Sequence, residues 1–282
     1  MSLKRTLKSA IGAIGRLPLI SAVVQNPNVR RVLERLPGSA ALYPRGWERA
    51  HPFDLAHGID ASGFASKEEL DSSLPGVAPS QPYGASQPSS LRAALATLPR
   101  LETCIFLDLG CGKGRPLFVA SEFPFRGILG VELSPSLATV ARKNAARIAR
   151  RYPARTCVRI EVGDASVHPL PAGDFVLFLY NPFSPELTSL LVTRLEAALA
   201  AEPRSLYVVY CNPVFGAAFD ASPLLTRRFA RMVPYAQEEL GYGPDVEDAV
   251  VVWQGGNAPP PVTRADARII ITKPGVRAEL AI

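Results

Sequence analysis

The sequence has few of the residues that build metal sites and disulfide frameworks. Its 282 residues include four cysteines and three histidines, and no Cys-x-x-Cys pair or clustered histidine occurs among them. This spacing gives no sign of a zinc site, so we expect no metal. We interpret the cysteines as small buried side chains in a reducing compartment, which predicts a cytoplasmic protein.

The sequence also lacks an apolar run long enough to cross a membrane. Between Lys4 and Val24 apolar residues recur every three to four positions among basic ones, as in an amphipathic helix, and Arg16 interrupts the apolar run. Residues 1–36 carry seven basic side chains and one acid. We interpret residues 1–50 as a basic helical N-terminal extension that packs on the main domain. Contact with a membrane surface and an organelle transit peptide are the alternatives.

The rest of the chain carries no excess of positive charge. The net charge is +6, and residues 1–36 account for all of it. Nucleic-acid-binding domains usually carry a broad positive excess, so the neutral remainder does not indicate a nucleic-acid partner. A small molecule is the expected partner, and the sequence leaves the oligomeric state open. Apolar residues make up 48% of the chain, enough for a large core.

The most informative stretch is FLDLGCGKGRP, from Phe106 to Pro116. The apolar residues before Asp108 predict a buried strand, and Pro116 fits the first turn of a helix. Glycines between them allow a tight turn and a close approach of a ligand, because a Cβ atom would obstruct it. A strand, a glycine turn and a helix N-terminus form a nucleotide site at the carboxyl edge of a parallel sheet. The glycines are Gly110, Gly112 and Gly114.

The spacing of this turn separates it from the common phosphate-binding motifs. The dinucleotide fingerprint G-x-G-x-x-G requires a glycine where Arg115 stands. No G-K-[ST] sequence follows four spacer residues, so the turn is not a Walker motif. Asp108 would repel a pyrophosphate but suits a ligand that has a positive charge and no phosphate.

The stretch from Asp108 to Gly114 resembles motif I, (D/E)-x-G-x-G-x-G, of class I S-adenosylmethionine-dependent methyltransferases. The resemblance covers about residues 81–253 and implies S-adenosyl-L-methionine as the cofactor. It also implies an α/β fold with a doubly wound, seven-stranded, mostly parallel sheet of the Rossmann-like methyltransferase type, which agrees with the alternating strand and helix patterns. We assign this domain to residues 99–255.

Acidic residues after the next two strands complete the expected cofactor site. Glu132 ends the apolar strand 127–131, where it can accept hydrogen bonds from both ribose hydroxyls. The resemblance implies that Asp164 meets the adenine amino group and that the backbone beside it, at Ala165, lies on the ring. We interpret residues 51–98 as an irregular cap or lid segment. Two aromatic residues are also expected at the cofactor: Tyr83 and Tyr180.

The strand predicted over residues 174–180 is followed by Asn181, Pro182 and Phe183. These residues resemble the (D/N)-P-P-(Y/F/W) motif of methyltransferases that act on amino nitrogens, although one proline is missing. We expect them to form the catalytic end of the site, with Asn181 orienting the acceptor. The stretch FDxxHGxDxSG resembles a segment of uncharacterised bacterial members of the superfamily. Its expected substrate-side residues are Phe53, His57 and Asp60, with the histidine as the candidate base.

The predicted function is S-adenosylmethionine-dependent methyl transfer to an unidentified, small-molecule acceptor. An amino group of a protein or an RNA is the alternative acceptor. A non-catalytic cofactor-binding module and an aminopropyltransferase are further alternatives. Asp108 and Arg115 disfavour an NAD-dependent oxidoreductase. After the main domain, residues 256–282 are interpreted as a C-terminal extension with an extra edge strand near 267–272.

Overall fold

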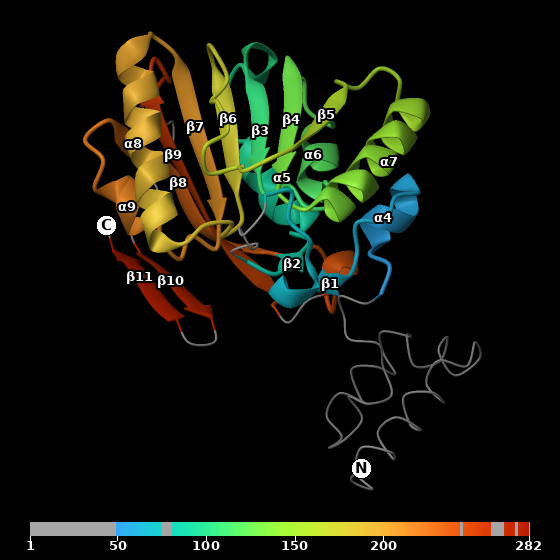
Figure 1. The fold of residues 1–282 in the computed structure, drawn as a ribbon. Coiled ribbons are helices and arrows are strands. Elements are labelled where there is room, and N and C mark those ends of the chain that lie inside the picture. The colour runs from blue at the N-terminus through green and yellow to red at the C-terminus, as the bar shows by residue number, and fades with distance from the viewer. Residues whose placement is uncertain (1–48, 75–80, 243–244, 261–267, 274–275, 282) are drawn as a thin grey trace, which may run out of the picture.

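The computed structural model describes residues 49–74, 81–242, 245–260, 268–273 and 276–281. The predictions for the basic extension therefore lie almost wholly outside the described residues. The described part is a seven-stranded sheet with helices on both faces (Figure 1). The sheet strands are β3 Ile105–Leu109, β4 Gly127–Glu132, β5 Val158–Val162, β6 Phe175–Leu179, β7 Ser205–Cys211, β8 Leu225–Pro234 and β9 Glu247–Gly256.

The strand order is β5-β4-β3-β6-β7-β9-β8. The first five of these strands run parallel, whereas β9 is antiparallel to both β7 and β8. The prediction of a doubly wound, mostly parallel, seven-stranded sheet is therefore confirmed. The chain order reverses between β3 and β6, and open α/β sheets bind ligands at this kind of switch point.

Alternate residues along each strand enter two separate hydrophobic cores. On β3, Phe106 belongs to the core under helices α5, α6 and α7, whereas Leu107 belongs to the core under α8 and α9. The central strands β3, β6 and β7 are buried on both faces for this reason, which explains their nearly continuous apolar sequences. The helices are α4 Pro52–His57, α5 Pro88–Leu95, α6 Arg115–Ala120, α7 Pro135–Arg151, α8 Pro185–Ala201 and α9 Ala217–Asp220.

Two helix starts follow their sequence signals closely. Ser134 caps α7, since its side chain accepts a hydrogen bond from the backbone N–H of Leu137. Ser184 caps α8 in the same way through the N–H of Leu187. In both helices a proline follows the cap, where its missing N–H leaves no helical hydrogen bond unmade.

The strand predicted near residues 267–272 is present, but it does not form an edge of the seven-stranded sheet. Strand β10 (Arg268–Lys273) pairs antiparallel with β11 (Val276–Ala281), and the two form a separate two-stranded sheet.

Another small sheet, β1 (Phe64–Ala65) with β2 (Tyr83–Gly84), lies near the carboxyl ends of the central strands (Figure 1). Single-turn 3-10 helices occur at Lys67–Glu69, Leu101–Thr103 and Gln237–Glu239. No helix in the described part of the chain is long and apolar enough to span a membrane.

A buried ion pair ties the segment before the sheet to the glycine turn. Arg115, at the start of α6, binds Asp54 of α4 through two parallel hydrogen bonds, Nε to Oδ1 at 3.0 Å and Nη2 to Oδ2 at 2.8 Å. Their side chains are only 3% and 2% exposed. The Asp54 carboxylate also accepts hydrogen bonds from the Ala61 N–H and the Ser62 hydroxyl, so the same group also holds the turn that follows α4. Charged pairs in this forked geometry fix orientation as well as distance.

We expect Asp54→Asn to lower the free energy of unfolding by about 3 kcal/mol, because it leaves the Arg115 guanidinium buried without a counter-charge. Urea denaturation measures the change. Arg92→Gln is the matched control, since the ion pair of Arg92 with Glu122 involves a 41% exposed arginine. That variant should lose less than about 1 kcal/mol. Equal losses in the two variants would contradict a special role for the buried pair.

Candidate cofactor and transfer site

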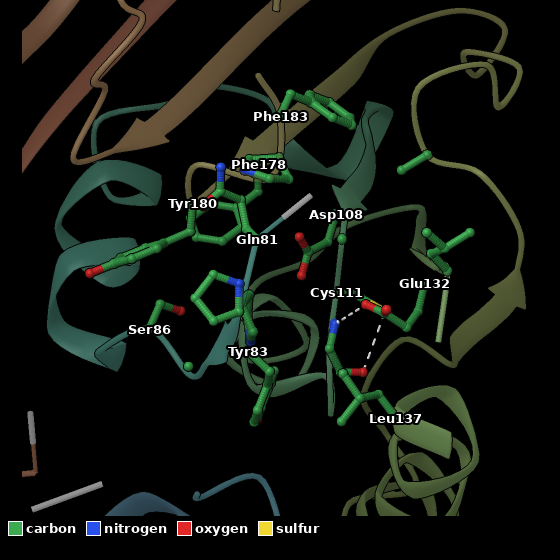
Figure 2. Close-up of a pocket in the computed structure, with 18 of the residues that line it drawn as sticks. Gln81, Tyr83, Ser86, Asp108, Cys111, Glu132, Leu137, Phe178, Tyr180 and Phe183 are labelled. Atoms are coloured by element: carbon green, nitrogen blue, oxygen red, sulfur yellow. Dashed lines mark hydrogen bonds between the residues drawn. The ribbon is translucent and has the colours of Figure 1, made fainter. Parts of the chain in front are cut away.

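A cavity of about 360 Å³ opens at the carboxyl ends of β3, β4 and β6. This volume lies within the usual range for small-molecule sites. Figure 2 shows Asp108, Cys111 and Glu132 gathered on one side, facing Tyr83, Ser86 and Tyr180. The predicted residues that line it are Tyr83, Asp108, Gly110, Gly112, Glu132, Asp164, Ala165, Tyr180, Pro182 and Phe183.

Glu132 is held rigidly at the end of β4. Its Oε2 accepts a hydrogen bond from the N–H of Gly112 at 2.7 Å, and its Oε1 accepts one from the N–H of Ser134 at 2.9 Å. Burial raises the pKa of Glu132, and these two backbone N–H groups oppose the rise. A carboxylate can accept about four hydrogen bonds, so Glu132 keeps capacity for a ligand hydroxyl.

Asp108 is the least satisfied polar group of the cavity wall. Its side chain is 2% exposed, and its Oδ2 has no hydrogen-bond partner among the described residues. Burial raises the pKa of Asp108 well above its ordinary value, and the negative charge of Glu132 adds to the rise. An unpaired buried carboxyl is costly, so this oxygen indicates a site for a cationic or hydrogen-bond-donating ligand.

The glycine turn fits closely under the ring of Tyr83. Gly112 has φ +54°, and a Cβ atom there would lie 2.3 Å from Cε2 of Tyr83. The Tyr83 hydroxyl donates to the carbonyl of Ala61 at 2.6 Å, which fixes the ring against the turn. Gly110 has φ +85°, which residues with a side chain rarely adopt, and a Cβ there would lie 3.1 Å from that of Pro182. Gly114 has φ +91° and caps α6, but it does not line the cavity.

Asp164 and Ala165 lie beyond the end of β5, on the Glu132 side of the cavity. Oδ1 of Asp164 accepts a hydrogen bond from the N–H of Ser166 at 2.8 Å, which folds the loop around the carboxylate. Ala165 is buried, whereas Asp164 is partly exposed. The loop therefore presents a carboxylate and a small apolar side chain to the same space.

A polar network fixes the opposite wall at Tyr180. The carboxylate of Asp248, on β9, is fully buried and accepts hydrogen bonds from the hydroxyls of Tyr180, Tyr235 and Ser90. The amide of Asn212 donates to both Asp248 and the Tyr180 hydroxyl. Burial raises the pKa of Tyr180 well above its ordinary value, and Asp248 adds to the rise. Tyr180 is therefore a neutral phenol.

Asn181 does not reach the cavity, contrary to the role expected for it. Its Nδ2 donates to the carbonyl of Asn212 at 2.8 Å, and its Oδ1 accepts from the hydroxyl of Tyr210 at 2.8 Å. The residue has φ 51°, a left-handed conformation that asparagine tolerates better than most residues. In this structure the amide joins the ends of β6 and β7, and the neighbouring Pro182 and Phe183 form the wall.

Three further predicted residues lie away from the cavity. Phe53 is buried against His57, with ring centroids 4.1 Å apart. Nδ1 of His57 lies 2.8 Å from the carbonyl oxygen of Phe53, and its ring also packs on Tyr152. Asp60 pairs with Lys113 at 3.4 Å. None of the three lines the cavity, so the structure places the candidate base His57 in packing between α4 and the end of α7.

Sequence reasoning missed residues that line the cavity or that hold its wall in place. Arg115 lines the cavity and is bound to Asp54, and the residues are 61 positions apart. Ser86 contributes its carbonyl to the same guanidinium, at 3.3 Å. Asp248 is the second residue of β9, and apolar residues follow it in the strand. The local sequence therefore does not indicate that its carboxylate binds the Tyr180 hydroxyl. A buried acid next to an apolar strand is a weak signal that could have drawn attention to it.

Residues 107–185 match the model of a family described as a methyltransferase domain. The fold is similar to three solved structures, among others. An RNA methyltransferase from Salinibacter ruber in complex with S-adenosyl-L-homocysteine is 20% identical, with 63% of this chain and 97% of that chain covered and a TM-score of 0.39. Magnesium protoporphyrin IX methyltransferase from Synechocystis PCC 6803 with bound SAM is 10% identical, with 60% and 79% covered and a TM-score of 0.43. TrmN from Thermus thermophilus is 20% identical, with 61% and 50% covered and a TM-score of 0.44.

These values are too low to assign an acceptor to this chain. A search of curated proteins found no match.

We expect Gly112→Ala to destabilise the protein by about 2–4 kcal/mol, because the new methyl group meets the Tyr83 ring and the backbone is left-handed. Gly163→Ala is the matched control: nothing lies within 4 Å of its Cβ position. That variant should change stability by less than about 0.5 kcal/mol. Urea denaturation compares the two, and a harmless Gly112→Ala would show that the ring is not packed on the turn.

Proposed function

We propose that the chain, in which residues 107–185 match a family model described as a methyltransferase domain, is a class I S-adenosylmethionine-dependent methyltransferase that transfers a methyl group to an uncharged, small-molecule acceptor. The observation that carries the proposal is the pair of buried carboxylates, Asp108 and Glu132, at the glycine turn. They come from adjacent strands and face one cavity. A site with this charge favours a cationic ligand.

The residues present fit S-adenosyl-L-methionine. The unpartnered Oδ2 of Asp108 offers an acceptor to a positively charged or donating group. The free lone pairs of Glu132 suit two neighbouring hydroxyls, and the loop at Asp164 and Ala165 suits a flat base with an amino group. Gly110 and Gly112 leave room for the ligand where side chains would fill it. When bound, this cofactor supplies a methyl group already activated on a sulfonium.

The charge of the cavity constrains the acceptor. Its lining includes three acids, Asp108, Glu132 and Asp164, whereas the Arg115 guanidinium is neutralised by Asp54. No unpaired cation lines the described cavity. The carboxylates therefore disfavour an anionic acceptor, and they stabilise a positive charge that forms on a neutral nitrogen. A neutral amine brings its own lone pair, so its attack requires no base from the chain.

The other contribution of the chain to catalysis is to position the cofactor and the acceptor. Tyr180 is locked by Asp248, and Phe183 is 5% exposed, so both rings are fixed walls of the cavity. Holding two reactants in line contributes up to about 7–11 kcal/mol to catalysis. An aminopropyltransferase needs acids around a polyamine at the transfer end of the site, and the stretch Asn181-Pro182-Phe183 does not supply them. An amino group of a protein or an RNA fits the charge argument equally and is the alternative acceptor.

Two measurements test the proposal. Isothermal titration should show binding of S-adenosylmethionine and S-adenosylhomocysteine, and none of NAD. Incubation with tritium-labelled S-adenosylmethionine and a lysate split into small molecules, protein and RNA should label the small-molecule fraction. Binding without labelling of any fraction would favour a non-catalytic module, and NAD binding would overturn the cofactor assignment.

We expect Glu132→Gln to weaken S-adenosylhomocysteine binding about tenfold to a hundredfold, since charge-assisted hydrogen bonds to a carboxylate contribute about 1.5–3 kcal/mol. Glu161→Gln is the matched control. Glu161 lies on the neighbouring strand β5 but does not line the cavity. Its substitution should leave the Kd unchanged. A Glu132→Gln protein that binds normally would remove this carboxylate from the site.

Binding of S-adenosylhomocysteine, whose amino group is cationic, should weaken as the pH falls. The pKa of Asp108 is raised, mainly by burial, so acid protonates Asp108 and removes its negative charge before that of an ordinary aspartate. Binding of a cation lowers that pKa and releases a proton, so affinity rises with pH across this window. Asp108→Asn is neutral throughout and should flatten the profile. Parallel profiles for the two proteins would contradict a charge role for Asp108.

A further inference from the structure

One exposed side of α7 carries positive charge without any acid. The helix contains five basic residues and no Asp or Glu. All five are exposed, and we call them the basic face of α7: Arg142, Lys143, Arg147, Arg150 and Arg151. The helix lies beside β5 at the outer edge of the sheet (Figure 1). The neutral total charge of the domain therefore hides a strong local excess.

The basic face has no counter-charge within the described structure. None of its five residues forms an ion pair with an acid that the structure describes. Arg142 donates to the carbonyl of Ile160, and Arg147 donates to Oδ1 of Asn144. Elsewhere, arginines such as Arg204 and Arg227 are paired with nearby carboxylates. The charge on α7 is thus available to an external partner.

The fold itself does not require these side chains. The helix packs on the sheet through its other side, where Leu137, Ala138, Ala141, Asn144 and Ile148 are buried. The helix dipole favours cations in the last turn, which accounts for Arg150 and Arg151. It does not account for the three basic residues in the middle of the helix, because the effect fades within one turn.

The basic surface continues past the end of the helix. Tyr152 follows α7 directly, and the guanidinium of Arg155 lies 3.9 Å from the centre of its ring. Arg151 lies 5.7 Å from the same ring. Lys143 to Arg151 spans about 12 Å along the helix, at 1.5 Å per residue. This length matches three to four nucleotides of a strand at about 3.4 Å each.

We propose that the basic face of α7 binds the sugar–phosphate backbone of a nucleic acid. Arginine predominates, and its planar fork of donors matches phosphate oxygens. A membrane surface fits less well, because the exposed positions among the charges are Thr139, Ala146 and Ala149, with no large apolar side chain to insert. The proposal goes beyond the proposed function: the surface lies outside the cavity, so nucleic-acid binding there does not depend on which molecule accepts the methyl group.

The test uses the full chain and a fluorescein-labelled 20-nucleotide RNA, with a DNA strand of the same sequence, and measures anisotropy over a salt series. The variant is the triple substitution Lys143→Gln, Arg147→Gln and Arg150→Gln. The matched control, Lys67→Gln, Arg126→Gln and Arg231→Gln, removes the same charge from exposed positions elsewhere. The basic N-terminal residues are unchanged in both proteins, so their contribution is equal.

We expect the α7 variant to bind about tenfold or more weakly at low salt, and its plot of log K against log salt to be less steep by about 2. The control should retain most of the affinity, and both variants should melt near the parent temperature and bind S-adenosylhomocysteine equally. Equal weakening in both variants, or no RNA and DNA binding, would overturn the proposal. So would α7-dependent binding of poly-glutamate or of anionic phosphatidylglycerol vesicles as tight as that of RNA.

Discussion

The buried ion pair between Arg115 and Asp54 is the contact on which the arrangement of the site depends. It lies inside the protein, where a broken pair would leave an uncompensated charge. One partner begins the helix after the glycine turn, and the other belongs to α4, before the sheet. The pair therefore joins the cofactor turn to the segment that covers it, and Ser62 and Ser86 add hydrogen bonds from that segment.

This ion pair fixes the position of the segment that precedes the sheet. The ring of Tyr83 fills the space that a Cβ at Gly112 would need, and its hydroxyl donates to the carbonyl of Ala61, seven residues beyond Asp54. The described part of the segment is thus a fixed wall, in which residues 81–86 line the cavity and α4 anchors them through the ion pair. A wall of this kind excludes water and orients a ligand without the cost of ordering a loop on binding.

Asp108 differs from the paired Asp54, because the fold leaves one of its buried carboxyl oxygens without a hydrogen-bond partner among the described residues. Such a group costs stability in the free protein and gains interactions when a cation enters the cavity. Asp248, equally buried, differs because hydroxyls and an amide satisfy it. One buried acid therefore serves the ligand, and the other holds the Tyr180 wall in place.

The sequence alone determined the features that depend on neighbouring residues and on the order of the strands: the glycine turn and the acids at the strand ends. Strand, acid and glycine turn are adjacent in the chain, and the carboxyl ends of parallel strands meet at one edge, so Asp108, Glu132 and Asp164 could be placed together in advance. The tertiary structure decided the contacts between distant segments: Arg115 with Asp54, and Tyr180 with Asp248, 68 positions apart. It also turned the amide of Asn181 toward β7, away from the cavity, because the left-handed backbone there aims the side chain at Asn212 and Tyr210. No local pattern encodes such pairings, since they depend on how side chains pack once the sheet has formed.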